Sequence, residues 1–105
     1  MPQFTVYENA DEETKDAIPC LLDVQSEILE GLKTRVVVPM CPSSAVGNKP
    51  MSDLSPSFEI MGVMHVLLTP QLSGISLSQL GPPICDLSEF RFQIINALDF
   101  LLTGF

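Results

Sequence analysis

The side chains that most often perform catalysis are sparse in this sequence. It contains one histidine, His65, which lies in the apolar run Met64–Leu68. A catalytic or metal site needs several groups that converge on one point, so a single histidine on a strand indicates a structural or surface residue. The consecutive acids Asp11–Glu13 lie in a polar stretch, where solvated charge is the expected role. We therefore predict no catalytic residue and no metal site.

The cysteines and glycines match no reactive motif. Cys20, Cys41 and Cys85 are odd in number and include no CxxC pair, which disfavours both a disulfide framework and a zinc site. We expect all three to be reduced. The glycines form no phosphate-binding pattern, and no serine lies in a G-x-S-x-G motif. These observations argue against an enzyme and against a cofactor.

The chain is acidic, with 13 acidic and 5 basic residues and a formal net charge of −8. Neutralising phosphates requires clustered lysine and arginine, so scattered bases make direct binding of DNA or RNA unexpected. The acids concentrate between Glu8 and Glu30. They either keep the chain in solution or attract a basic segment of a partner protein, and both interpretations stay open. The five bases are Lys15, Lys33, Arg35, Lys49 and Arg91.

The length of 105 residues predicts one domain spanning residues 1–105. Hydrophobic residues make up 46% of the chain, and the mean hydropathy is +0.31. The core of a 105-residue domain can bury only part of so many apolar side chains. We therefore expect a second copy or a partner to cover the remaining apolar surface. No leader-like segment and no apolar run of about 18 residues occurs. We expect a cytoplasmic protein that does not enter a membrane.

Alternating apolar residues and β-branched runs predict several short strands. Thr34–Met40 contains three consecutive valines, which is typical of a buried strand, and Pro39 is expected at its end. Gly81–Pro83 is expected to terminate the last strand. The segments Asn9–Ala17 and Cys41–Pro56 are expected to be loops. The predicted strands are Gln3–Glu8, Pro19–Ser26, Thr34–Met40, Ser57–Met61, Met64–Thr69 and Ile75–Leu80.

From Leu87 onward, apolar residues recur at spacings of three and four, which predicts a C-terminal helix. Asp86 or Ser88 can cap its start, and Gly104 suits its end. A second apolar flank of this helix belongs either to the core or to a partner-binding surface. That flank consists of Phe92, Ala97 and Phe100. Short strands followed by one helix predict a mainly β (α+β) fold, a small antiparallel barrel with one C-terminal α-helix.

Several segments together carry a resemblance to a known family. They include DVQS at Asp23–Ser26, the strand TRVVVP, and a glycine one residue before the C-terminus. Along nearly its whole length the chain resembles the CcdB family, the toxins of CcdA–CcdB toxin–antitoxin modules. The segments at 8–17 and 41–55 match poorly. The matching segments are Gln3–Phe4, Val6–Tyr7, Asp23–Leu29, Thr34–Pro39, Asp86–Ser88, Ile95–Ala97 and Thr103–Phe105.

The resemblance implies a homodimer of SH3-like β-barrels, each with a C-terminal helix. CcdB toxins bind the A subunit of DNA gyrase and trap the enzyme while it is attached to cleaved DNA. The antitoxin CcdA neutralises the toxin with a flexible C-terminal segment. The pair represses its own operon, with CcdA holding the operator DNA. A toxin of this kind works by binding and needs no catalytic group.

The resemblance also implies residues that contact gyrase, concentrated at the end of the chain. Thr103 stands where the best-known pattern has tryptophan, whose indole can stack on an arginine of gyrase. Phe105 can restore an aromatic ring nearby, or it can be a packed or frayed chain end. Asp99 adds a negative charge that favours the same arginine, and Gly104 lets two chain ends lie side by side on the dimer axis. The carried-over positions are Ile28, Leu29, Asp99, Leu102, Thr103, Gly104 and Phe105.

For antitoxin binding, the charge pattern indicates the first acidic loop and the strand edges near it. An acidic surface attracts a basic segment of another protein. The predicted positions are Glu8, Asp11, Glu12, Glu13 and Asp16.

Two alternatives remain open. Thr103 also suits a degenerate family member that binds CcdA but no longer poisons gyrase, and toxicity in cells without CcdA would exclude it. An endoribonuclease of the MazF/Kid type would share the barrel, but His65 and five dispersed bases are a poor set for cleaving RNA.

Overall fold

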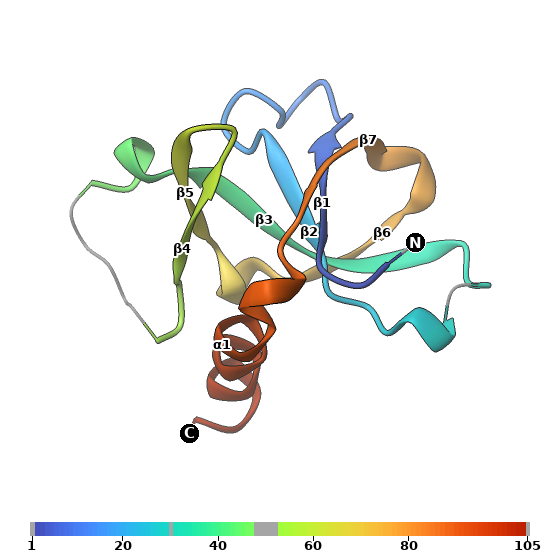
Figure 1. Cartoon of the computed structure of the whole chain (residues 1–105). Coiled ribbons are helices and arrows are strands. Elements are labelled where there is room, and N and C mark those ends of the chain that lie inside the picture. The colour runs from blue at the N-terminus through green and yellow to red at the C-terminus, as the bar shows by residue number, and fades with distance from the viewer. Residues whose placement is uncertain (1, 30, 48–52, 105) are drawn as a thin grey trace.

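The computed structural model describes residues 2–29, 31–47 and 53–104. Its strands form a curled half-barrel, and the C-terminal helix projects from one end of it (Figure 1). This confirms the predicted mainly antiparallel β fold with a C-terminal α-helix, of the small SH3-like kind. The elements are β1 (Thr5–Asn9), β2 (Cys20–Asp23), β3 (Thr34–Pro42), β4 (Ser57–Ile60), β5 (Val63–Leu67), β6 (Ser73–Ser76), β7 (Leu80–Asp86) and α1 (Arg91–Thr103).

The strands pair antiparallel in the order β4-β5-β3-β2-β1-β7, and β6 pairs with β3 outside this path. β3 therefore changes partner along its length, with Thr34–Val37 on β6 and Met40–Pro42 on β5. Pro39 lies inside β3 at this changeover, so its predicted place at the strand's end was wrong. Its carbonyl accepts the N–H of Leu68 at 2.9 Å. Because N–H and C=O of a strand residue point the same way, the missing donor faces the gap between β6 and β5.

Both faces of the central strands are buried. Val6, Leu22 and Val38 lie opposite one another in register on β1, β2 and β3, and each is 0% exposed. The prediction of a half-buried first strand was wrong, because Tyr7, on the other face of β1, is only 7% exposed. On this second face, Ile75 of β6 lines a cavity together with Leu21 of β2 and Pro39 of β3.

The segment Ile75–Leu80 was predicted as one strand but contains a break. β6 ends at Ser76, a 3₁₀ turn (η4, Leu77–Gln79) follows, and β7 begins at Leu80. The hydroxyl of Ser76 accepts the N–H of Ser78 at 3.3 Å, and this local bond competes with the strand ladder. The prediction for Gly81–Pro83 was also wrong, because these residues lie within β7. An edge strand tolerates proline, and the pairing of β7 with β1 shifts register twice here.

Other boundaries differ by a few residues. β1 continues to Asn9, and β3 continues to Pro42 into the segment predicted as a loop. The β4–β5 hairpin turns on Met61 and Gly62 alone, with φ of 52° and 81°. Positive φ at both central residues gives the two-residue turn whose twist matches the flanking strands.

The helix ends at Gly104 as the sequence predicted, but its predicted start was wrong: α1 begins at Arg91, and its N-cap residue Phe90 makes no side-chain cap hydrogen bond. Asp86 Oδ1 accepts the N–H of Ser88 at 2.8 Å, at the start of a 3₁₀ turn (η5, Ser88–Phe90) that leads into α1. Gly104 adopts φ 80° and donates its N–H to the carbonyl of Phe100 at 2.9 Å. Phe90 packs on Phe58 of β4 with ring centroids 5.2 Å apart, which holds the helix against the half-barrel.

Candidate protein-binding surfaces

The helix α1 has a buried face and an exposed face. Ile94 and Ala97 are 0% exposed and belong to the core side. The second flank predicted from the sequence is therefore divided, because Ala97 is core whereas Phe92 and Phe100 are exposed. Phe92 is 84% exposed, the largest exposure of any aromatic among the described residues.

A row of four exposed side chains runs along the outer face of α1. Residues three and four apart on a helix are neighbours, and Phe92, Asn96, Asp99 and Thr103 follow this spacing. Leu102, 74% exposed, lies beside the end of the row. We call these five residues the helix row. It combines apolar groups at both ends with an amide and a carboxylate between them, a mixture typical of protein-binding surfaces.

The C-terminal end of the helix row collects three of the predicted gyrase contacts. Thr103 Oγ1 donates to the carbonyl of Asp99 at 2.7 Å, so the hydroxyl is satisfied within the helix. Gly104 is exposed and turns the chain out of the helix through its left-handed conformation. Phe105 lies outside the described residues.

The two remaining predicted gyrase contacts lie on a different element. Ile28 and Leu29 belong to a 3₁₀ turn (η1, Glu27–Leu29) and are 90% and 46% exposed. In Figure 1 the segment after β2 lies at the lower right and the end of α1 at the lower left. One chain therefore does not bring these residues next to the helix row. The two groups face the same end of the molecule, away from the β1–β2 loop.

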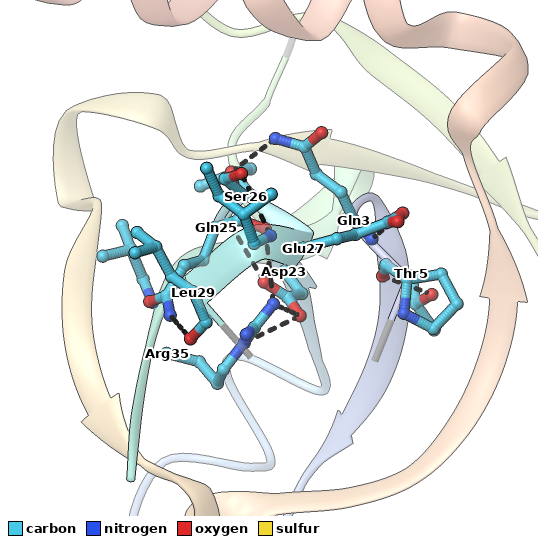
Figure 2. Close-up of polar contacts among 12 residues, drawn as sticks. Gln3, Thr5, Asp23, Gln25, Ser26, Glu27, Leu29 and Arg35 are labelled. Carbon is cyan, nitrogen blue, oxygen red and sulfur yellow. Dashed lines mark hydrogen bonds and ion pairs between the residues drawn. The ribbon is translucent and has the colours of Figure 1, made fainter. Parts of the chain in front are cut away.

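The η1 segment is tied to a buried ion pair (Figure 2). Asp23 on β2 and Arg35 on β3 are both 0% exposed, and Arg35 binds Asp23 Oδ2 through Nε at 3.1 Å and Nη2 at 2.7 Å. Nη2 also donates to the carbonyl of Gln25 at 3.3 Å. Asp23 Oδ1 accepts the N–H of Gln25 at 3.0 Å, which ends β2 three residues before its predicted end at Ser26.

The N-terminal residues hold the same segment from the other side. The N–H of Gln3 donates to Glu27 Oε1 at 3.1 Å, and its side-chain amide donates to the carbonyl of Val24 at 3.0 Å. Phe4 follows with φ 70° and is 2% exposed. A positive φ in a buried aromatic residue is strained, and it is held by backbone bonds to Asp23 and Leu87.

The acidic β1–β2 loop is folded around Asn9. Its amide nitrogen donates to Thr14 Oγ1 at 2.9 Å and to the carbonyl of Ile18 at 2.8 Å. Its Oδ1 accepts the N–H of Asp11 at 2.9 Å. Asp11 Oδ1 in turn accepts the N–H of Glu13 at 3.0 Å. The loop therefore presents its carboxylates on a defined scaffold.

Three of the five predicted antitoxin residues share one depression. Glu8, Glu12 and Asp16 line it together with Gly81 and Pro82 of β7, and its volume is about 410 Å³. We call this the acidic depression. Asp11 instead lines a neighbouring cavity of about 230 Å³, and Glu13 lines neither of these two cavities. Lys15 also borders the depression, with Nζ 2.8 Å from Glu12 Oε2.

The histidine and the three cysteines, whose side chains could be reactive, lie on strands of the sheet. His65 is 7% exposed, and its Nδ1 lies 2.9 Å from the carbonyl of Val63, which confirms a structural histidine. The cysteines are free thiols, as predicted. Burial, followed by the nearby Cys85 and Glu8, raises the pKa of Cys20 from 9.0 to about 11. Burial also raises the pKa of Cys41 and Cys85.

Sequence reasoning named Phe92 on the second flank of the helix, but it missed Asn96 and the buried Gln25. Phe92 and Asn96 extend the helix row, and helical spacing counted back from Thr103 would have found Asn96. Gln25 lies inside the resembling DVQS segment, but its role depends on contacts with β3 and η1 that the spacing of residues does not reveal.

Comparison with known proteins gives one family. The family model described as CcdB protein matches residues 3–104 of the chain. The match covers β1 through α1 and so includes the helix row, η1 and the acidic depression. No helix within the described residues has both the length and the apolar character needed to cross a membrane.

Proposed function

Because the chain belongs to the CcdB family of toxins from toxin–antitoxin modules, we propose that it binds the A subunit of DNA gyrase and traps the gyrase–DNA cleavage complex. On this proposal residues 1–105 form one toxin domain. It acts in the cytoplasm as a homodimer, contacts no DNA directly and uses no cofactor or catalytic step.

The observation that carries the proposal is the helix row. Its C-terminal end holds Asp99, Leu102 and Thr103, which are all exposed. An exposed apolar side chain beside a carboxylate can pack on the stem of an arginine while the carboxylate pairs with its guanidinium. Phe92 lies about three helical turns before Thr103 and supplies an exposed aromatic face in a chain that lacks the tryptophan of the familiar pattern.

A homodimer accounts for the separation of the predicted contacts. Ile28 and Leu29 lie apart from the helix row within one chain, and a two-fold axis places the same patch of each protomer next to its copy. We propose that the two protomers together present one surface, with both η1 turns flanking two helix ends. Sedimentation equilibrium tests the assembly, and a monomer at micromolar concentration would contradict it.

A DNA-cleavage assay tests the toxin proposal. It combines purified gyrase, supercoiled plasmid, ATP and this protein. We expect linear DNA after detergent and protease treatment. Phe105→Ala and Leu102→Ala should reduce it, whereas Leu77→Ala, at an exposed leucine on η4, should not. No cleaved complex with the unmodified chain would contradict the proposal.

We further propose that CcdA binds at the acidic depression and that the toxin and antitoxin together repress their operon. Glu8, Glu12 and Asp16 converge there, which favours a basic antitoxin segment. Reversing these three charges to lysine should weaken antitoxin binding and reduce its dependence on salt. Glu59→Lys, at an exposed position of β4, is the matched control.

The second candidate is a family member that binds CcdA without poisoning gyrase. The bond between Thr103 Oγ1 and the Asp99 carbonyl favours it, because that hydroxyl is already used within the helix. Tight CcdA binding without cleavage of gyrase-bound DNA would select this candidate.

A further inference from the structure

The side chain of Gln25 joins β3 to the η1 turn. Its Oε1 accepts the N–H of Val36 at 2.9 Å, and its Nε2 donates to the carbonyl of Leu29 at 3.2 Å. Gln25 is 7% exposed. Figure 2 shows its side chain between the ion pair of Asp23 and Arg35 and the end of η1. An amide suits this place because it offers an acceptor and a donor at once.

The backbone of Gln25 is held just as firmly. Its N–H donates to Asp23 Oδ1 at 3.0 Å, and its carbonyl accepts Arg35 Nη2 at 3.3 Å. All four polar groups of Gln25 are therefore engaged, three of them with β2 and β3. The fourth, the side-chain N–H, reaches out to η1.

The η1 turn has little packing of its own. Its three residues Glu27–Leu29 are exposed, and Ile28 is exposed to 90%. Its backbone is closed by the N–H of Leu29 on the carbonyl of Ser26 at 3.1 Å and continues with the N–H of Leu32 on the carbonyl of Leu29 at 3.2 Å. Hydrogen bonds to neighbouring segments of the chain must therefore fix the position of η1. Gln25 makes such a contact from a buried place.

We propose that Gln25 is a positioning residue for gyrase binding, which holds Ile28 and Leu29 in the conformation that meets the partner. The proposal rests on the proposed function. Gln25 does not contact gyrase itself. Because it already restrains η1 in the free protein, η1 loses less conformational entropy when gyrase binds. A single net hydrogen bond corresponds to a roughly fivefold change in an equilibrium constant. We expect loss of this bond to weaken gyrase binding by about that factor.

Gln25→Glu is the sharpest variant. It keeps the shape and the acceptor for Val36, but it removes the donor and places a carboxylate oxygen against the Leu29 carbonyl. Gln71→Glu, at an exposed glutamine of a 3₁₀ turn (η3, Thr69–Gln71), controls for the added charge. Gln25→Met avoids a buried charge and tests the same loss if Gln25→Glu folds poorly.

Two measurements separate positioning from general stability. In the free protein, amide hydrogen exchange should accelerate at Leu29 and Leu32 in the Gln25 variants, while amides of β2 keep their protection. In gyrase binding, the loss should shrink when Ile28 and Leu29 are already alanine, because coupled positions are not additive.

Unchanged exchange at Leu29 and Leu32 would overturn the proposal, as would an equal loss of affinity in the alanine background. If the unmodified chain binds gyrase and neither Gln25 variant loses affinity, the positioning role of Gln25 is overturned while the proposed function stands. Failure of the unmodified chain to bind gyrase would overturn both the proposed function and this inference. Faster exchange confined to η1, with a background-dependent loss, would support both.

Discussion

Asp23 and Arg35 form an ion pair of 2.7 Å, between Oδ2 and Nη2, in which neither side chain reaches solvent. A buried pair gains from a low-dielectric surrounding only if its remaining donors and acceptors are satisfied. Asp23 meets this condition with both oxygens engaged, whereas Nη1 of Arg35 has no partner among the described residues. The pair therefore fixes β2, β3 and the start of η1 relative to one another, at a cost in solvation.

Breaking this pair from one side should destabilise the fold strongly. In Asp23→Ala the guanidinium stays buried without a counter-charge, and we expect a loss of roughly 3–5 kcal/mol in the free energy of unfolding. Urea denaturation measures it. The double variant Asp23→Leu with Arg35→Met should recover much of the loss, and Glu12→Ala at the exposed pair with Lys15 should change little. A small loss in Asp23→Ala would mean that Arg35 can reach water.

Phe92→Ala should separate binding from folding. Since Phe92 is 84% exposed, its truncation should leave the urea midpoint nearly unchanged while gyrase affinity falls roughly tenfold. Ile94→Ala, two residues on, removes a fully buried side chain and should cost about 2–5 kcal/mol of stability. Isothermal titration and urea melts on both variants test this. An unchanged gyrase affinity of Phe92→Ala would show that Phe92 is not part of the binding surface.

Gly81→Ala should loosen the contact between β1 and β7. A Cβ at residue 81 would lie 3.0 Å from the carbonyl oxygen of Glu8, a backbone atom that cannot turn aside. We expect a loss of about 1–3 kcal/mol. Gly74→Ala, on β6, meets nothing within 4 Å and is the matched control. Equal melting temperatures for the two variants would show that β7 shifts without cost.

Cys20 should resist alkylation in the folded protein. A pKa of about 11 instead of 9.0 leaves roughly a hundredfold less thiolate at pH 8. Iodoacetamide labelling followed by mass spectrometry should modify Cys85 before Cys20, and urea should abolish the difference. Between pH 9 and 11 the Cys20 thiol keeps its proton in the folded state, whereas the unfolded chain releases it. The contribution of protonated Cys20 to the free energy of unfolding is therefore fully present below pH 9 and declines as the pH rises toward 11. Rapid labelling of Cys20 at pH 8 would contradict this.

The sequence was sufficient for the fold because its strongest signals were local. The three valines of β3, the helical spacing after Leu87 and the C-terminal cap at Gly104 each depend on neighbouring residues. The errors lie where tertiary contacts or side-chain bonds decide. Pro39 is tolerated within β3 only because the strand changes partner there.

The candidate surfaces were only partly predictable. Charge and resemblance pointed to the acidic loop and the chain end, but the fold distributes those residues over separate surfaces. Glu8, Glu12 and Asp16 line one depression together with Gly81 and Pro82 of β7, which are far from them in the sequence. The side chain of Gln25 joins Val36 to Leu29 through a cross-strand geometry that no sequence spacing encodes.

The paired prolines of β7 carry a consequence for assembly into fibrils. β7 ends the sheet order, and Pro82 and Pro83 are consecutive and exposed. Because proline has no N–H, neither residue can donate a backbone hydrogen bond to a strand added at this edge. A strand from another molecule cannot complete its ladder there. An apolar, acidic chain of this size is thus protected from edge-to-edge polymerisation at β7, and open-ended growth of its sheet would have to begin elsewhere.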